Sequence, residues 1–276
     1  MNIFYDIASL RQHLGKERHI AFVPTMGNLH DGHLELIKHA KQLSPCVVVS
    51  IFINRLQFLP HEDFDRYPRT FEDDCKRLAE LDVNTLFAPD EKILFPTTQE
   101  FLLALPPVAD ILEGEFRPGF FRGVATIVLK LFNIIQPNLA VFGKKDYQQL
   151  HIVREMVNQL NVPIDVVASE TVRALDGLAL SSRNQYLNKE QRAEACNLYQ
   201  TLLDIKHAII SGNRDFWALQ DYATQSLEKR HWKVDYIRIH KRDSLMPAHA
   251  DDTRLVVLGA AWLNQTRLID NIEIDD

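Results

Sequence analysis

Two histidines separated by an aspartate and a glycine carry the clearest chemical signal in this chain. His30 and His33 lie in PTMGNLHDGH, which follows an apolar run and precedes a helical pattern. Free backbone N–H groups and the helix dipole attract anions at such a junction. Gly27 and Gly32 let the backbone approach a phosphate, and imidazole N–H groups can stabilise charge developing at an α-phosphate. We predict a phosphate site; the alternative is that the glycines shape a turn and the histidines cap the helix.

A second candidate segment places two hydroxyls and a guanidinium next to one another, at Ser181, Ser182 and Arg183. Hydroxyls donate locally and arginine binds phosphate oxygens through two N–H groups, which suits the β- and γ-phosphates of a nucleotide. The alternative is a serine-rich linker with a solvated arginine. Together with the two histidines, this segment predicts attack on the α-phosphate of ATP with pyrophosphate as the leaving group.

Two further polar segments follow predicted strands. In GKKDYQQ, Lys145 could contact phosphate as a point charge and Asp146 could cap the following helix, although glycine and aspartate are also ordinary capping residues. Gln149, one turn into that helix, could hold a substrate hydroxyl or carboxylate. Gln57 follows a buried strand and is a candidate polar selector in an apolar pocket, with a surface glutamine as the alternative.

The elements that position these residues alternate between strands and helices. Up to about residue 170 we expect strands at 19–23, 47–53, 85–88, 139–142 and 164–168, and helices at 34–43, 70–81, 123–135 and 146–160. This alternation predicts an α/β fold, a Rossmann-like doubly wound parallel sheet with helices on both faces. Ligands of such sheets bind beyond the carboxyl ends of the strands, where the candidate segments lie.

The alternation of predicted strands and helices ends at about residue 171. We expect one long helix at 188–210 capped by Asn188, a helix at 216–229, and two final strands at 234–240 and 255–262. This pattern predicts a smaller α+β C-terminal domain. We place a Rossmann-like nucleotide-binding domain at 1–174 and a lid domain at 175–276, with the boundary in the loop 173–182.

Composition limits the partners. The 276 residues include 31 basic and 37 acidic side chains, a net charge of −6, which argues against a nucleic-acid partner. The three cysteines form no CxxC pair, so neither a disulfide framework nor a zinc site is predicted. No run approaches the roughly 20 apolar residues of a membrane span, and the N-terminus lacks a signal-peptide pattern. We expect a cytoplasmic protein without a membrane partner.

Seven segments, taken in order, resemble the signatures of the pantothenate synthetase family, within the nucleotidyltransferases that carry an HxGH motif and a later KMSKS-like loop. The segments are PTMGNLHDGH, VVSIFINRLQF, DRYPRT, RPGFFRGVATIVLKLFNIIQP, VFGKKDYQQL, TVRALDGLALSSRNQYL and TRLIDN. They run from about residue 20 to 190 and reappear near the C-terminus. The motifs range individually from weak to strong, and their combination is highly specific.

This resemblance implies a two-step reaction. Pantoate attacks ATP at the α-phosphate to give pantoyl adenylate and pyrophosphate, and β-alanine then attacks the acyl group to give pantothenate and AMP. It implies catalytic roles for His33, His30, Lys145, Ser181, Ser182 and Arg183, with His33 as proton donor. It implies an ATP site of Met26, Gly27, Asn28, Leu29, His30, Asp31, Gly32, His33, Gly143, Lys144, Lys145, Asp146, Val172, Leu180, Ser181, Ser182 and Arg183. Gln57 and Gln149 would hold pantoate. The family resemblance also implies a homodimer, and ATP chemistry implies Mg²⁺, for which no protein ligand is named.

The chain departs from the family pattern at four positions. Arg55 stands where proline is usual, Phe120 where histidine is common, Lys144 where glutamate is common, and Leu180 replaces a frequent methionine. No group that the chemistry needs is removed. Arg117 and Arg122 could face phosphates or stabilise a loop, and we leave both possibilities open.

Two other functions fit parts of the pattern. A simple nucleotidyltransferase would share the histidines and the Ser-Ser-Arg loop, but a phosphorylated acceptor would call for added arginine or lysine rather than the uncharged Gln57 and Gln149. A nucleotide-binding module without catalysis could keep the glycines and lose His30, His33 or Lys145, all of which are present.

Overall fold

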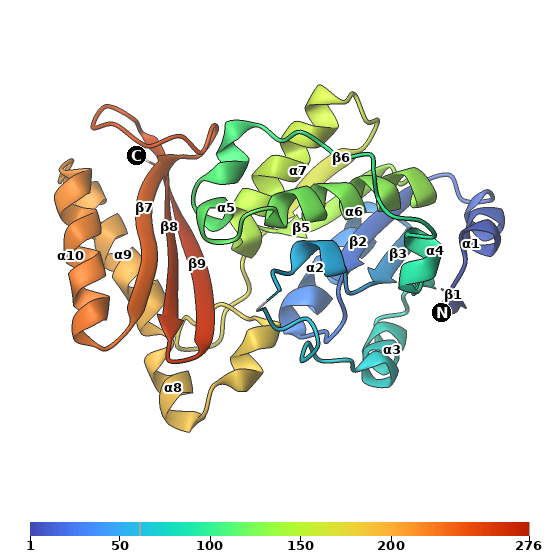
Figure 1. Cartoon of the computed structure of the whole chain (residues 1–276), viewed down its shortest axis with the longest axis horizontal. Coiled ribbons are helices and arrows are strands. Elements are labelled where there is room, and N and C mark those ends of the chain that lie inside the picture. Colours follow the sequence, from blue (N-terminus) through green and yellow to red (C-terminus); the bar gives the residue numbers. More distant parts are fainter. Residues whose placement is uncertain (61, 276) are drawn as a thin grey trace. The chain divides into compact units, whose positions relative to one another are not determined.

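The computed structural model describes residues 1–60 and 62–275, and the chain divides into two compact units (Figure 1). Unit 1 contains Met1–Gly143 and Gln149–Glu170, and unit 2 contains Lys144–Gln148 and Thr171–Asp276. The chain therefore passes between the units after Gly143, after Gln148 and after Glu170. The short segment Lys144–Gln148 belongs to unit 2 although it lies between two parts of unit 1, which the sequence pattern does not indicate.

Unit 1 is built on a six-stranded parallel sheet in the order β1-β4-β3-β2-β5-β6. The strands are β1 (Asn2–Phe4), β2 (Ile20–Thr25), β3 (Cys46–Ile51), β4 (Thr85–Phe87), β5 (Leu139–Gly143) and β6 (Asp165–Ser169). This confirms the predicted doubly wound sheet and adds β1. The order reverses direction between β2 and β5, so their carboxyl ends flank the topological switch point where such sheets bind ligands. Pairing of β2 with β5 covers Ala21 and Phe22, whereas pairing with β3 runs along all of β2.

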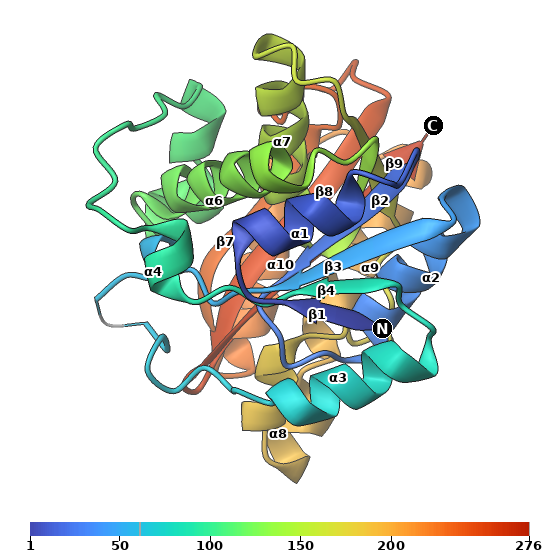
Figure 2. The same cartoon turned by 90° about the vertical axis from the view of Figure 1, so that its right-hand side faces the viewer.

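Helices cover both faces of this sheet. Figure 2 shows α1 (Ile7–Leu14) and α6 (Phe120–Ile135) on one side of the strands and α3 (Phe71–Glu80) on the other. Alternate residues of β2 enter two different cores, because successive side chains of a strand point to opposite faces. Phe22 joins the first core with α1, α6 and α7 (Tyr147–Gln159), and Val23 joins the second with α2 (Asp31–Leu43) and α3.

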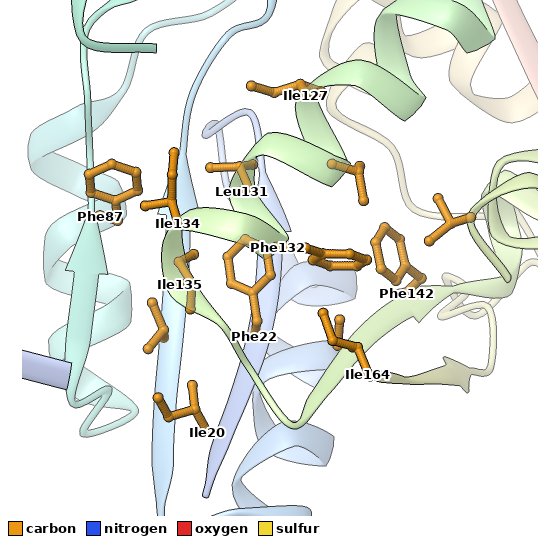
Figure 3. Close-up of a cluster of buried hydrophobic side chains, with 14 of the residues drawn as sticks. Ile20, Phe22, Phe87, Ile127, Leu131, Phe132, Ile134, Ile135, Phe142 and Ile164 are labelled. Carbon is orange, nitrogen blue, oxygen red and sulfur yellow. The ribbon is translucent and has the colours of Figure 1, made fainter. Parts of the chain in front are cut away.

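The first core is rich in aromatic rings. Phe132 on α6 lies between Phe22 and Phe142, with ring centroids 6.3 and 6.4 Å away and edge-to-face geometry (Figure 3). Edge-to-face pairs are favourable beyond the area they bury. This packing fixes α6 on the sheet, which matters because α6 contacts the segment that carries Gln57. Short helical segments connect the main elements of the chain: η1 (Arg55–Gln57), α4 (Glu91–Leu94), η2 (Pro107–Asp110), α5 (Glu113–Phe116), η3 (Lys144–Asp146) and η4 (Ser182–Tyr186).

Unit 2 contains an antiparallel sheet, β7 (Lys233–Lys241), β8 (Arg254–Leu263) and β9 (Thr266–Asp275), beside α8 (Lys189–Glu194), α9 (Asn197–Ile210) and α10 (Phe216–Lys229). Figure 1 shows α9 and α10 along one side of this sheet. Their apolar faces form a separate core with the strands, including Leu202, Leu227 and Val257. This confirms the predicted smaller α+β part of the chain.

The prediction of one long helix over 188–210 is wrong. The cap at Asn188 is confirmed as a capping box with Gln191, but α8 ends at Glu194 and α9 begins at Asn197. At the break, the Asn197 amide donates to the carbonyl of Glu194 at 2.8 Å, and the Cys196 thiol lies 3.1 Å from the carbonyl of Ala193. Side chains that bind nearby carbonyls compete with the helical ladder.

The sequence pattern also misses the final strand, β9. Strand patterns are recognised by regular alternation of apolar and polar residues, and β9 buries the polar residues Thr266, Asp270 and Asn271. These residues have partners that sequence spacing cannot show. Within the described parts of the chain, no helix has the length and apolar character needed to cross a bilayer.

Candidate active site

The two histidines follow a sharp turn at the carboxyl end of β2. Gly27 and Asn28 have positive φ values of 81° and 51°, the left-handed region that disfavours most side chains. A Cβ atom on Gly27 would lie 3.1 Å from both Asp74 Oδ2 and Ile51 Cγ2. Glycine is therefore required by the backbone conformation and by the close neighbours. The turn directs the chain from the sheet into α2.

Asp74 of α3 holds this turn from the side. The residue is 2% exposed, and its carboxylate accepts from the backbone N–H groups of Asn28 at 2.9 Å and Leu29 at 2.7 Å. The hydroxyl of Thr70 donates to it at 3.1 Å. Hydrogen bonds to a carboxylate are stronger than neutral ones. The backbone of the histidine segment is thus fixed by a residue from another helix, which sequence analysis missed because no local pattern links α3 to the turn.

His30 and His33 cap α2 reciprocally. Nδ1 of His30 accepts from the N–H of Gly32 at 3.1 Å, and Nδ1 of His33 accepts from the N–H of His30 at 3.3 Å. A ring nitrogen that accepts bears no proton, so the neutral ring carries its proton on Nε2. The ring centroids lie 4.1 Å apart. The cap therefore fixes the tautomer that offers two Nε2–H donors, and capping and phosphate binding are compatible roles.

Gln57 is brought to the same segment by η1. Its amide nitrogen lies 2.8 Å from the sulfur of Met26, and its oxygen accepts from Asn54 at 3.2 Å. Asn54 is buried, caps η1 and also donates to the carbonyl of Gly123 at 3.1 Å. A Cβ on Gly123 would lie 2.1 Å from the carbonyl oxygen of Leu56, so α6 and η1 touch through backbone. Gln57 is thus a positioned side chain rather than a loose surface glutamine.

Gln149, the other predicted pantoate ligand, lies on α7. Within residues 1–60 and 62–275 no hydrogen bond joins it to Gln57.

Arg117 has a loop-stabilising role. Its guanidinium binds Glu62 at 2.6 and 2.8 Å and donates to the carbonyl of Gln57 at 3.2 Å. The ring of Phe120 lies 3.7 Å below it, a favourable cation–π distance. Phe120, one of the departures from the family pattern, thus supports the arginine that holds the backbone of Gln57. At another departure, Arg55 lies 4.0 Å over the ring of Phe64.

In unit 2, η3 is bound to the last strand. The Asn271 amide donates to the carbonyls of Lys144 and Lys145, both at 2.9 Å. The Lys144 ammonium lies 2.8 Å from Glu273, and the Tyr147 hydroxyl donates to the same carboxylate at 2.7 Å. The Lys144 departure therefore has a structural partner in this chain. Lys145 is paired with Asp146 at 3.7 Å.

These contacts set the protonation of the cluster. Burial, the hydrogen bond to Glu273 and its charge raise the pKa of Tyr147, so its hydroxyl stays a donor. Burial by itself raises the pKa of Glu273, but the bonds from Lys144 and Tyr147 and the charges of Lys144 and Arg242 bring that pKa below its ordinary value. Glu273 is therefore an ionised acceptor for η3.

The Ser-Ser-Arg segment follows a tight hairpin of unit 2. The backbone N–H of Leu180 donates to the carbonyl of Val172 at 2.9 Å, and the backbones of Arg173 and Ala179 form an antiparallel β-bridge. The turn contains Gly177 with φ 92°, where a Cβ would lie 2.5 Å from the Tyr199 ring. Ser181 then caps η4 by accepting from the N–H of Arg183 at 3.3 Å. Two pairs of the predicted ATP-site residues are therefore in contact: Val172 with Leu180, and Ser181 with Arg183.

A magnesium ion has no carboxylate cage among the described residues, since no group of three or more histidine, cysteine, aspartate or glutamate side chains is placed to hold a metal. Mg²⁺ commonly binds through substrate phosphates with few protein ligands.

The parallel sheet and the polar residues at the carboxyl ends of its strands define the structural class of this protein. A doubly wound α/β protein carries two capping histidines beyond the β2 strand end, next to the switch point, and has a second α+β unit with lysine and Ser-Ser-Arg segments. Proteins of this architecture bind ligands at that edge.

Comparison with known proteins gives the family. The sequence model described as pantoate-beta-alanine ligase matches residues 2–273. A pantothenate synthetase of Nitrosomonas europaea is 60% identical over 271 residues, 98% of each chain. The crystal structure of pantothenate synthetase from Thermus thermophilus is 40% identical, with a TM-score of 0.95 over 100% of both chains. The pantoate-beta-alanine ligase of Francisella tularensis, complexed with beta-gamma ATP and β-alanine, is 34% identical with a TM-score of 0.80, covering 99% of this chain and 97% of that one. The chain belongs to the pantoate-beta-alanine ligase family.

Proposed function

We propose that this protein condenses (R)-pantoate with β-alanine at the expense of ATP. The pantoate carboxylate attacks the α-phosphorus, an oxygen–phosphorus bond forms, and pyrophosphate leaves. The β-alanine amine then attacks the acyl carbon of pantoyl adenylate. A carbon–nitrogen bond forms, the bond between the acyl carbon and the bridging oxygen breaks, AMP leaves with that oxygen, and the amine loses a proton. Membership of the ligase family supports this reaction over the nucleotidyltransferase and non-catalytic alternatives. Aligning the reactants and neutralising phosphate charge account for catalysis of this kind without a side-chain nucleophile.

The observation that carries the proposal is the reciprocal cap of His30 and His33. Because both Nδ1 atoms accept backbone N–H groups, both Nε2–H groups are donors, and donors are what the charge growing on the α-phosphate requires. His33 is the proposed proton donor. In unit 2, Lys145, Ser181, Ser182 and Arg183 are proposed to bind the remaining phosphates. Gln57 and Gln149 are proposed to bind pantoate.

Magnesium is proposed to enter on the triphosphate, where it would neutralise phosphate charge. The family resemblance further supports a homodimer in the cytoplasm. Light scattering on the purified protein tests the assembly, and a mass of twice the 31.9 kDa chain is expected. A mass equal to one chain would contradict the dimer without affecting the proposed reaction.

The test of the reaction follows two products. Pyrophosphate release should require pantoate, and AMP release with pantothenate formation should also require β-alanine. His33→Gln is the informative variant, because glutamine at the third position of a helix can preserve a capping box while removing the imidazole donor. We expect near-normal stability and a loss of roughly 10²–10³-fold in the rate of pyrophosphate release, the cost of removing one preorganised donor.

His39→Ala is the matched control, since His39 lies on the same helix and its ring contacts Ser169 at 2.6 Å instead of capping. We expect it to keep the adenylation rate. Full activity of His33→Gln would overturn the role of His33. Absence of pantoate-dependent pyrophosphate release by the wild-type protein would overturn the proposed reaction.

A further inference from the structure

Two adjacent residues of β9 bind two segments that are far away in sequence. Asp270 and Asn271 are 4% and 5% exposed, although strand interiors usually bury apolar side chains. Successive side chains of a strand leave it in opposite directions, so neighbouring residues can hold different partners. Asn271 binds η3, and Asp270 binds the hairpin that precedes the Ser-Ser-Arg segment.

The Asn271 amide uses both of its N–H groups on consecutive carbonyls, those of Lys144 and Lys145, each at 2.9 Å. In a trans peptide the C=O and the N–H of the same unit point in opposite directions. The backbone N–H groups of Lys145 and Asp146 therefore point away from Asn271. One side chain thus fixes the orientation of two successive peptide planes and the base of the Lys145 side chain.

Asp270 fixes the other segment through Arg173. The guanidinium meets the carboxylate at 2.6 and 2.8 Å and also donates to the carbonyls of Gly177 at 3.0 Å and Asn271 at 3.1 Å. It lies 3.7 Å over the Tyr199 ring. The four hydrogen bonds and the ring contact constrain the hairpin, because the planar guanidinium fork accepts little change in geometry. Ser181 follows directly on the returning arm of that hairpin.

We propose that Asp270 and Asn271 are positioning residues that set the geometry of the two phosphate-binding segments of unit 2. This inference rests on the proposed function and extends it to TRLIDN, a segment that the proposed chemistry does not otherwise use. The two residues touch no substrate in the proposal. They act through Lys145 on one side and through the Ser181–Arg183 segment on the other, so their loss should alter ATP binding more than pantoate or β-alanine binding.

The test compares Asn271→Asp with the wild-type protein. Aspartate has the shape of asparagine but places acceptor oxygens against the two carbonyls, which need donors. Misplacement of a binding group by about 1 Å can cost about 100-fold, and we expect kcat/KM for ATP to fall by roughly 10- to 100-fold. The KM values for pantoate and β-alanine should change less than about threefold, because their proposed ligands lie elsewhere. Calorimetric titration with ATP should show the same loss in affinity.

Asp235→Asn is the matched control. Asp235 lies on β7 of the same sheet, its side chain is 7% exposed, and it binds Arg267 of β9 at 2.7 Å and the Trp262 indole at 3.1 Å. Breaking this pair destabilises the same sheet without touching η3 or the hairpin. The three tryptophans, Trp217, Trp232 and Trp262, all belong to unit 2, so their fluorescence measures the unfolding of this unit in every variant. The kinetics of each variant are measured under conditions in which tryptophan fluorescence shows that unit 2 is folded.

The proposal holds if Asn271→Asp weakens ATP binding and Asp235→Asn, at comparable stability, does not. It is overturned if folded Asn271→Asp binds ATP like the wild type, or if Asp235→Asn weakens ATP binding equally. Should Asn271→Asp fail to fold, Asn271→Ala removes the donors without adding charge and decides the question on the same criteria. If the wild-type protein binds ATP yet makes no pantothenate, the proposed reaction fails, and the ATP titrations still decide the positioning role.

Discussion

The carboxylate of Asp74 offers a sharp test of how the histidine segment is held. Asp74→Asn preserves the volume of the side chain but replaces one acceptor oxygen by an NH₂ group. The wild-type oxygens accept from Leu29 N–H on one side and from Asn28 N–H and the Thr70 hydroxyl on the other. The hydroxyl can rotate to accept from the new NH₂, but a backbone N–H cannot. Either orientation of the amide leaves one of the two N–H groups facing a donor.

The magnitude follows from these contacts. An unpaired buried N–H costs about 1–3 kcal/mol, and hydrogen bonds to a charged group contribute about 1.5–3 kcal/mol each against about 1 for neutral ones. We therefore expect the free energy of unfolding of unit 1 to fall by about 2–4 kcal/mol. At 2–4 °C per kcal/mol for a unit of this size, the melting temperature should fall by roughly 5–15 °C.

Asp73→Asn supplies the control. Asp73 precedes Asp74 on α3, but its carboxylate is exposed and pairs with Lys76 at 2.9 Å, one turn along the helix. Exposed pairs of this kind contribute little to stability, because water and salt screen them. The same chemical substitution one residue away should therefore leave the melting temperature of unit 1 nearly unchanged.

Hydrogen exchange is the assay that locates the effect. Unit 1 contains none of the three tryptophans, so fluorescence does not report on it, whereas exchange followed by mass spectrometry does. In Asp74→Asn the amides of Asn28 and Leu29 should exchange faster, and pyrophosphate release should slow about tenfold or more because the histidines lose their fixed backbone. Unchanged exchange at both amides, together with a wild-type melting temperature, would refute the role assigned to Asp74.

Two further predictions rest on other contacts. Gly123→Ala should raise the KM for pantoate by roughly tenfold or more, because the new Cβ would lie 2.1 Å from the Leu56 carbonyl and must displace η1 with Gln57. Gly15→Ala, at an ordinary φ of −61°, is the control and should leave that KM unchanged. Equal effects of both substitutions on the KM for pantoate would contradict this explanation. Burial lowers the pKa of His240 below its ordinary value of 6.5, so unit 2 should lose stability as the pH falls from about 6.5 toward that lower pKa, where the unfolded chain binds a proton that the folded chain resists. His240→Asn, whose amide can still donate to Leu245, should show a slope shallower by up to about 1.4 kcal/mol per pH unit in tryptophan-monitored unfolding, and an unchanged slope would rule out His240 as its source.

Much of the fold follows from the sequence because parallel strands buried on both faces have a local signature. The run around Val47–Val49 is continuously apolar, and all three residues are fully buried. The position of His30 and His33 at a strand end is likewise local information. The sequence alone does not show that the same histidines can both cap the helix and donate to phosphate. This compatibility depends on which ring nitrogen accepts from which backbone N–H group.

The rest of the candidate site depends on contacts between residues far apart in the chain. Asp74 reads as an ordinary acidic residue at the start of a helix, where acidic residues are common, and only the fold brings it to Leu29. In the sequence, Asn271 only interrupts a strand pattern, and the structure shows that its amide binds the carbonyl of Lys144. A polar residue inside an apolar pattern is the signal that could have indicated Asn271, whereas no such signal marks Asp74. The partners of both residues come only from the three-dimensional structure.

The membership of Lys144–Gln148 in unit 2 limits how the chain can be cut. A fragment beginning at Thr171 would contain β7–β9 but would lack the carbonyls that bind Asn271 and the hydroxyl and ammonium groups that bind Glu273. A fragment ending at Glu170 would carry η3 without its strand. Each piece would therefore keep one half of a buried polar contact, which is costly to leave unpaired. Co-expression of the two pieces is the arrangement in which both halves regain their partners.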